Sequence, residues 1–290
     1  MVKAFLPPLV VLDPLLTSWL IEDIGRGDRA TQGLEGETKR LAKAQWVAKQ
    51  SGVICGLPIA SRIFQLLDRK VDFCAVVAEG EFCDQGEIVA KIQGNVEPLL
   101  MGERVALNLA MRLSGVATLT RQYVDAIADL PAKLVDTRKT TPGLRLLEKY
   151  ATQVGGGINH RFGLDDAAMI KDNHIAAAGG ISAAVSQIRS FIPYPLTIEV
   201  ETSNLEEVEK ALEQKVDIIM LDNMSIEMMQ TAVKMIRQQD RKVNIEASGN
   251  VTLETIRQIA TTGVDYISSS APITRSTWLD LSMNLELIKA

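Results

Sequence analysis

The chain has 290 residues, of which 47% are hydrophobic and 23% are charged. This composition excludes wholesale disorder, and the length is typical of one large domain with a smaller one. The formal net charge is −5, and no basic block is present. These two features argue against a protein that binds nucleic acid or an anionic membrane.

The most apolar stretch near the N-terminus, residues 5–16, is interrupted by three prolines and an aspartate. A membrane span needs roughly 20 apolar residues, so none is predicted here. The stretch also lacks the basic leader and the small-residue cleavage site of a signal peptide. The cysteines are odd in number and widely spaced, which is typical of free thiols in a reducing cytoplasm. They are Cys55, Cys74 and Cys83.

The first hundred or so residues mix helical and strand-like patterns. Residues 16–28 predict a short helix that runs into a glycine turn, and residues 38–56 alternate as strands do. Residues 59–68 have the apolar spacing of an amphipathic helix. Turn formation is the default role for the acidic residues of the glycine turn. These are Glu22, Asp23 and Asp28.

Strands separated by Gly/Asp turns are predicted over residues 71–94. A long helix follows over residues 98–130, with a break expected near Ser114 and Gly115. This first part is therefore predicted to be an α+β domain.

From Lys133 onward, short β-branched runs alternate with helical segments. The predicted strands cover residues 133–138, 167–173, 196–201, 217–223, 243–248 and 265–270. The predicted helices between them cover residues 144–153, 181–191, 204–215, 225–239 and 253–263. Strands and helices in this order imply a parallel sheet with right-handed crossovers.

Each of these apolar runs ends in a polar residue. The residues are Arg138, Lys171, Glu201, Asp222, Ser248 and Ser268. Chemistry spread over the carboxyl ends of many strands is typical of a β/α barrel, whereas an open sheet concentrates it at one switch point. A closed or nearly closed barrel with its site at these strand ends is therefore favoured.

Basic residues gather around the first two of these strand ends. Arg138, Lys139 and Lys171 directly follow runs that should be buried, so their charges need a partner such as a carboxylate or phosphate. His160 and Arg161 follow a glycine-rich loop between these strands. For Arg145 and Lys149, four residues apart on a helix, a solvated charged face is an equally good interpretation.

Acidic residues gather at the later strand ends. Glu199 and Glu201 share one face of their strand, and Asp222 and Glu246 lie on the following two strands. They suit sugar hydroxyls, a hydrated Mg²⁺ or pairing with the basic cluster. Among the glycine-rich stretches, only Ser248-Gly249-Asn250, after a strand and before a helix, has the arrangement of a phosphate loop.

The segment VDTRKTTPGLRLLEKYATQVGGGINHRFGLDDAAMIKDNHI, residues 135–175, resembles the signature of the quinolinate phosphoribosyltransferase family. Five shorter motifs are similar to the same family in the same order. They are EDIGRGD, MGERVALNLAMRLSGVAT, TIEVET, IIMLDN and IEASGNVTLETI. The resemblance covers nearly the whole chain.

The resemblance implies an α/β fold with an N-terminal α/β sandwich domain and an incomplete parallel β/α barrel. The sandwich domain would comprise residues 1–113, joined by the tail 275–290, and the barrel residues 114–274. The implied reaction joins quinolinate to phosphoribosyl pyrophosphate (PRPP) with Mg²⁺. It yields nicotinate mononucleotide, pyrophosphate and CO₂ for NAD biosynthesis. The family also implies a homodimer or larger assembly.

The resemblance implies two groups of site residues. Those for the quinolinate carboxylates are Arg138, His160, Arg161, Lys171 and, from the partner subunit, Arg104. Those for PRPP are Thr137, Lys139, Glu201, Asp222, Ser248, Gly249, Asn250, Ser268, Ser269 and Ser270, with Lys139, Glu201 and Asp222 also catalytic. Glu201 and Asp222 are the candidates for Mg²⁺ contacts. The chain departs from the family pattern at Gln153 and Val154, and at Ser270, where glycine is common.

The sequence also allows two other interpretations. The first is a phosphoribosyltransferase of the same architecture that acts on nicotinate, although two carboxylates need more cationic partners than one and this chain offers at least five candidates. The second is a carrier module, since residues 78–94 are similar to a biotinyl or lipoyl hairpin. A carrier needs a modifiable lysine at the exposed turn, whereas Lys91 lies within the second predicted strand.

Overall fold

The computed structural model describes residues 4–34, 36 and 38–288, and the chain divides into two compact units. The first unit comprises residues 1–121, 146–156 and 276–290, and the second comprises residues 122–145 and 157–275. Among the described residues, no helix is long and apolar enough to cross a membrane.

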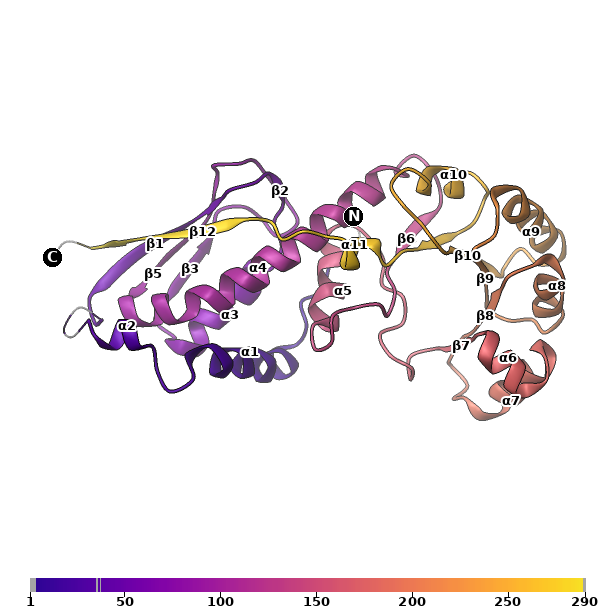
Figure 1. Cartoon of the computed structure of the whole chain (residues 1–290), viewed down its shortest axis with the longest axis horizontal. Helices are drawn as coiled ribbons and strands as arrows, with labels where there is room; N and C mark the ends of the chain where they lie inside the picture. The colour runs from indigo at the N-terminus through magenta and orange to yellow at the C-terminus, as the bar shows by residue number, and fades with distance from the viewer. Residues whose placement is uncertain (1–3, 35, 37, 289–290) are drawn as a thin grey trace. The chain divides into compact units, whose positions relative to one another are not determined.

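The first unit contains an antiparallel four-stranded sheet with helices gathered beside it (Figure 1). Its strand order is β12-β1-β5-β3, and a short pair, β2 with β4, lies apart from that sheet. The strands are β1 (Leu41–Ala48), β2 (Gly52–Val53), β3 (Asp72–Ala75), β4 (Phe82–Cys83), β5 (Ile88–Asn95) and β12 (Leu281–Leu287). The helices are α1 (Leu9–Ile24), α2 (Arg29–Gln32), α3 (Leu57–Leu67), α4 (Val96–Asp125) and α5 (Arg145–Val154).

The core of this unit forms because one face of the sheet is apolar. Along β1 every second residue is buried, ending in Trp46 and Ala48. The Trp46 ring contacts Phe64 of α3 and Phe73 of β3 edge to face, with ring centroids 6.4 and 5.7 Å apart. Because β4 pairs with β2, and β5 with β1 and β3, the hairpin of a carrier module does not form here.

The long helix α4 is continuous from Val96 to Asp125, so the break expected near Ser114 and Gly115 is wrong. The Ser114 hydroxyl accepts a hydrogen bond from the Cys55 amide (2.9 Å) and donates one to the Cys55 carbonyl (3.1 Å). A Cβ at Gly115 would lie 1.9 Å from the Thr277 carbonyl oxygen. The two residues therefore serve close packing inside a continuous helix.

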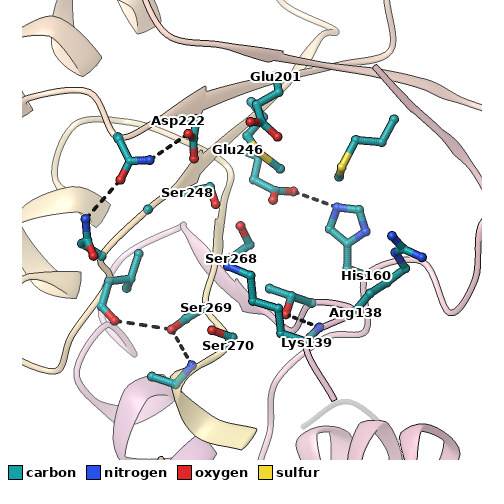
Figure 2. A pocket seen from close by; sticks show the side chains of 18 of the residues that line it. Arg138, Lys139, His160, Glu201, Asp222, Glu246, Ser248, Ser268, Ser269 and Ser270 are labelled. Atoms are coloured by element: carbon teal, nitrogen blue, oxygen red, sulfur yellow. Dashed lines mark hydrogen bonds and ion pairs between the residues drawn. The ribbon is translucent and has the colours of Figure 1, made fainter. Parts of the chain in front are cut away.

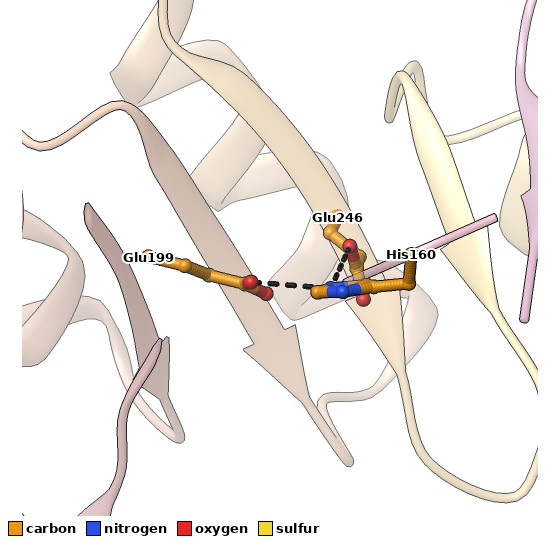
Figure 3. A group of neighbouring side chains, drawn as sticks. All are labelled: His160, Glu199 and Glu246. Carbon is orange, nitrogen blue, oxygen red and sulfur yellow. Dashed lines mark ion pairs between the residues drawn. The ribbon is translucent and has the colours of Figure 1, made fainter. Parts of the chain in front are cut away.

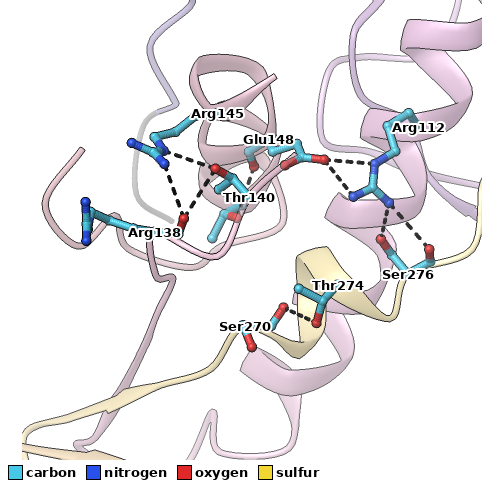
Figure 4. Close-up of polar contacts among 9 residues, drawn as sticks. Arg112, Arg138, Thr140, Arg145, Glu148, Ser270, Thr274 and Ser276 are labelled. Carbon is cyan, nitrogen blue, oxygen red and sulfur yellow. Dashed lines mark hydrogen bonds and ion pairs between the residues drawn. The ribbon is translucent and has the colours of Figure 1, made fainter. Parts of the chain in front are cut away.

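Helix α5 was predicted among the barrel helices, but residues 146–156 group with the first unit. Glu148 is fully buried there and accepts two hydrogen bonds from the Arg112 guanidinium, at 2.7 and 3.0 Å (Figure 4). Tyr150 donates a hydrogen bond to Glu79 (2.9 Å). Lys149 is also fully buried, so its interpretation as part of a solvated face is wrong.

The second unit is built on a parallel six-stranded sheet with order β6-β11-β10-β9-β8-β7. Its strands are β6 (Lys133–Val135), β7 (Ala168–Ile170), β8 (Ile198–Thr202), β9 (Ile218–Asp222), β10 (Asn244–Ser248) and β11 (Tyr266–Ser268). Its helices are α6 (Asp172–Ala178), α7 (Ile181–Phe191), α8 (Leu205–Glu213), α9 (Ile226–Gln239), α10 (Ile256–Ala260) and α11 (Ala271–Thr274). Helices α7, α8 and α9 lie on the outer side of the strands (Figure 1).

This sheet curls but remains open between its two edge strands, β6 and β7. At the opening, Ile158 forms a single parallel bridge with Val135 of β6. The segment after Ile158 thus takes the place where a further strand would close the barrel. The predicted fold class, an α/β protein with an incomplete parallel barrel and a separate first domain, is confirmed.

Candidate active site

The carboxyl ends of the parallel strands surround a pocket of about 630 Å³ that lies within the second unit. Arg138, Lys139 and His160 lie on one side of it, and Glu201 and Asp222 lie across from them (Figure 2). Every residue that the family resemblance implies for the barrel site lines this pocket, whereas Glu199 does not. Those that line it are Thr137, Arg138, Lys139, His160, Arg161, Lys171, Glu201, Asp222, Ser248, Gly249, Asn250, Ser268, Ser269 and Ser270.

Arg104 belongs to the first unit, on α4. Its side chain is 61% exposed, and one guanidinium nitrogen lies 4.0 Å from the Glu103 carboxylate. The residue is not part of the pocket lining.

Two acidic residues line the pocket at the ends of neighbouring strands. Glu201 of β8 accepts a hydrogen bond from the Lys171 ammonium (2.7 Å), and both side chains are only partly exposed. Asp222 ends β9 and accepts a hydrogen bond from the side-chain nitrogen of Asn223 (2.8 Å). The Asn223 side-chain oxygen in turn accepts one from Asn250 (3.2 Å), which links Asp222 to the serine–glycine loop.

The loop Ser248-Gly249-Asn250 turns sharply beside these acids. Gly249 has φ +101°, and a Cβ there would lie 2.2 Å from the Asn223 side-chain oxygen. Glycine is therefore required both for the backbone angle and for space. Next to this loop, the Ser269 hydroxyl donates a hydrogen bond to the Val251 carbonyl (3.4 Å) and accepts one from the Ala271 amide (3.2 Å), which fixes the start of α11.

His160 lies between two buried carboxylates (Figure 3). Its Nε2 is 3.1 Å from Glu199 Oε2 and 3.4 Å from Glu246 Oε2. Burial disfavours the charged ring, but the two carboxylates outweigh this effect and raise the pKa of His160 to about 10. Burial raises the pKa of Glu199, and the interaction with His160 opposes that rise. Ligand atoms of the three residues lie within 4.8 Å of one another, a spacing that a metal ion could also bridge.

The two pocket arginines that flank the sheet opening repel one another. Burial lowers the pKa of Arg161, the nearby charge of Arg138 lowers it further, and the carboxylates of Glu199 and Asp166 oppose these effects. Like charges held together without a bound anion are unfavourable, so this arrangement suits a ligand that carries negative charge.

Asp136 is a site residue that the sequence interpretation did not single out. The residue is only 2% exposed, and its carboxylate accepts hydrogen bonds from the His160 amide (2.8 Å) and the Asn159 side chain (2.7 Å). It follows the apolar strand β6 directly, which is the same signal that identified Arg138 and Lys139. The residue fixes the segment that carries His160 and Arg161.

The comparisons with known proteins agree with this geometry. Residues 28–114 match the model of the quinolinate phosphoribosyl transferase N-terminal domain, and residues 116–284 match that of the C-terminal domain. The "Probable nicotinate-nucleotide pyrophosphorylase (carboxylating)" of Synechocystis sp. is 62% identical over 97% of this chain and 94% of its own. The protein of the same name from Bacillus subtilis is 42% identical over 95% of this chain and 94% of its own.

Solved structures give the same result. The crystal structure of NadC from Streptococcus pyogenes superposes with a TM-score of 0.93 at 41% identity, covering 98% of this chain and 100% of that one. The nicotinate-nucleotide pyrophosphorylase of Francisella tularensis gives a TM-score of 0.91 at 37% identity over 98% of this chain and 99% of that one. The chain therefore belongs to the quinolinate phosphoribosyl transferase family.

Proposed function

We propose that this enzyme transfers the phosphoribosyl group of PRPP to quinolinate, with release of pyrophosphate and CO₂, in NAD biosynthesis. Membership of the family supports this activity, and so do the names of its relatives. The observation that carries the proposal is that one pocket has Arg138, Lys139 and His160 on one side and carboxylates with the loop Ser248–Asn250 on the other. Quinolinate is a dicarboxylic acid and needs the cations. PRPP is a sugar phosphate and needs carboxylates for its hydroxyls and the loop for a phosphate.

The cationic side of the pocket would bind the two quinolinate carboxylates. Arg138 and Arg161 can each form paired hydrogen bonds with a carboxylate, while His160 and Lys171 add further positive charge. Lys171 forms an ion pair with Glu201 in the described chain. When quinolinate binds, the Lys171 ammonium would interact with both the Glu201 carboxylate and a carboxylate of the ligand.

The acidic side of the pocket, together with Thr137 and Lys139, would bind PRPP. Thr137 and Lys139 would contact the pyrophosphate, and Glu201 and Asp222 the ribose hydroxyls. The loops Ser248–Asn250 and Ser268–Ser270 would receive a phosphate through hydroxyl and backbone donors. Ser270 can still donate these hydrogen bonds in place of the glycine that is common in the family.

The residues present fit a magnesium ion. Glu201 and Asp222 supply carboxylate oxygens at the ends of adjacent strands, which are the ligands that Mg²⁺ prefers, directly or through water. The ion, when bound with PRPP, would neutralise charge on the departing pyrophosphate.

Positioning and electrostatic stabilisation would supply most of the rate enhancement. Lys139 would stabilise the leaving pyrophosphate, and Glu201 and Asp222 would orient the ribose as positive charge develops on it. Arg138 and Arg161 would hold quinolinate so that its pyridine nitrogen is in line to attack the ribose. Once the ring nitrogen is positively charged, it stabilises the carbanion that forms next to it when the 2-carboxylate leaves as CO₂. The carbanion then takes a proton from solvent to give nicotinate mononucleotide.

We also propose that the enzyme is a cytoplasmic homodimer or larger assembly, in which Arg104 of one subunit completes the pocket of its partner. An exposed arginine outside the pocket is consistent with a role at a neighbouring subunit. The three cysteines are free thiols, which are usual in proteins of a reducing compartment.

A direct assay tests the activity. The enzyme is incubated with PRPP, Mg²⁺ and either quinolinate or nicotinate, and both nucleotide and CO₂ are measured. We expect CO₂ and nucleotide in equal amounts from quinolinate, and a catalytic efficiency with nicotinate lower by about 100-fold or more, because part of the cationic site would then be left unpaired. Equal efficiency with nicotinate would contradict the proposal.

A further inference from the structure

Two segments that carry the proposed carboxylate-binding residues lie side by side at the opening of the sheet. Residues 137–140 follow β6 and carry Arg138, and residues 158–162 occupy the opening and carry Arg161. Because Arg138 and Arg161 carry like charges and both line the pocket, contacts between the segments help to keep the two guanidinium groups in place.

Such contacts run along both segments. At the start, Val135 bridges Ile158, and next to it the Asp136 carboxylate holds the segment through Asn159 and His160. The next contact along both segments is made by Arg145, a residue of the same unit at the start of α5.

The Arg145 guanidinium donates hydrogen bonds to both segments, and Figure 4 shows those to residues 137–140. Its Nη2 donates to the Arg138 carbonyl (3.3 Å) and its Nε to the Thr140 hydroxyl (3.0 Å). Its Nη1 donates to the Phe162 carbonyl (3.0 Å). A planar fork with five N–H donors can make these three contacts at once, which a lysine ammonium on a flexible stem cannot.

We propose that Arg145 is a positioning residue that ties the two arginine-bearing segments together, and so builds the dicarboxylate site before quinolinate arrives. The inference rests on the proposed function and adds to it a residue that touches no ligand. Without the tie, the like charges of Arg138 and Arg161 would move the segments apart, and the ligand would have to draw them together at the expense of its binding energy. These hydrogen bonds also show that the Arg145 guanidinium is bound to the protein, so its interpretation as part of a solvated charged face is wrong.

A double-mutant cycle on catalytic efficiency with quinolinate tests the inference. We expect Arg145→Ala to lower kcat/KM by about 10- to 100-fold, because small displacements of a positioning group have effects of this size. In the Arg138→Ala background the same change should cost only a few-fold, since Arg145 acts through Arg138. Equal effects in both backgrounds would overturn the inference.

Two further variants separate positioning from general stability. Arg145→Lys should recover little of the lost efficiency, whereas added guanidinium should partly restore Arg145→Ala. Arg189→Ala is the matched control, because Arg189 of α7 also donates to a backbone carbonyl, that of Lys215 at 3.1 Å, but lies outside the pocket lining. It should retain wild-type efficiency, and all variants should unfold at similar temperatures.

Amide hydrogen exchange in the ligand-free enzyme gives a readout that does not depend on the substrate. In Arg145→Ala, residues 137–140 and 158–162 should exchange faster than in the wild type, while β8 and β9 should not change. If the wild type fails to use quinolinate, the proposed function is wrong, but the exchange data still test the tie. Unchanged exchange in both segments would overturn the inference even in an active enzyme.

Discussion

The His160 side chain faces two opposing influences. Glu199 and Glu246 favour the protonated ring, whereas the Arg161 amide donates a hydrogen bond to Nδ1 (2.7 Å) and favours the neutral form. A hydrogen bond between neutral groups contributes about 0.5–1.5 kcal/mol, and one to a charged group about 1.5–3 kcal/mol. Two carboxylates therefore outweigh one amide, and we expect His160 to remain a cation that can bind a ligand carboxylate.

NMR titration checks this expectation, since the chain has only two histidines and His174→Gln assigns the spectrum. We expect the wild-type His160 ring to stay protonated at pH 8. Glu199→Gln should lower its pKa by about one unit or more. In that variant KM for quinolinate should rise with pH above the lowered pKa, because the neutral ring no longer attracts the ligand.

Glu79→Gln serves as the control for this experiment. Glu79 is a partly buried carboxylate of the first unit that accepts hydrogen bonds from the Gly56 and Leu57 amides. Its replacement should leave the His160 titration unchanged. A neutral His160 at pH 8 in the wild type would contradict the expectation, as would a stoichiometric metal ion held by His160, Glu199 and Glu246, because a metal-bound imidazole is neutral.

Arg138 is the residue whose removal should affect quinolinate most directly. We expect Arg138→Ala to reduce kcat/KM by a factor that corresponds to about 2–5 kcal/mol, because one ligand charge is left desolvated and unpaired. Steady-state kinetics with quinolinate measures the loss. Arg241→Ala, at an exposed arginine of the same unit, should behave as the wild type. Wild-type efficiency of Arg138→Ala would refute its assigned role.

At the scale of elements, the packing of α4 makes a prediction that runs against helix propensity. Gly115→Ala should stabilise a helix interior by about 1 kcal/mol on propensity alone. In this chain the added Cβ would meet the Thr277 carbonyl oxygen at 1.9 Å and its carbon at 3.0 Å, and both are backbone atoms. We therefore expect a net loss of about 1–3 kcal/mol in the free energy of unfolding, from overpacking.

Urea unfolding of the two proteins measures this change. Gly33→Ala is a suitable control, since Gly33 has right-handed helical angles (φ −73°) and an added Cβ would approach other atoms no closer than 3.4 Å. It should change stability little. An increase in stability for Gly115→Ala would show that the contact with residue 277 can relax.

The elements that the sequence predicts best are those of the second unit. All six of its strands and the helices α7 to α10 were expected where they occur, because apolar strand runs and amphipathic helices have distinct periods. The polar residues that end these strands share one pocket, since the carboxyl ends of parallel strands meet at one edge. The contacts of His160 with Glu199 and Glu246 were not predicted, because they depend on side chains that only the curled sheet brings together.

At the scale of the whole molecule, the sequence is less informative about which segments fold together. Periodicity identifies α5 as a helix, but not that Glu148 and Lys149 are buried in the first unit. Likewise nothing in the local pattern of β12 shows that it pairs with β1 at the edge of the first sheet. Long-range pairing of this kind is set by the tertiary fold, which local propensity does not encode.

The proposed assembly leads to a test by subunit mixing. If Arg104 completes the partner's pocket, Arg104→Ala and Arg138→Ala homodimers are each defective at both sites. A mixed dimer would have one pocket with both substitutions and one with neither. After complete subunit exchange, half of the dimers are mixed, so we expect activity to recover to about a quarter of the wild-type value.

The matched control mixes Arg138→Ala with Lys139→Ala. Arg138 and Lys139 line the pocket of their own chain, so every pocket in the mixed dimer keeps one substitution and activity should stay low. Dimers carrying two different tags allow the mixed species to be purified and counted by mass. If Arg104 acts across the interface, one pocket of each mixed Arg104→Ala/Arg138→Ala dimer carries neither substitution and must be active. Purified mixed dimers that recover no activity would therefore place Arg104 outside the partner's site.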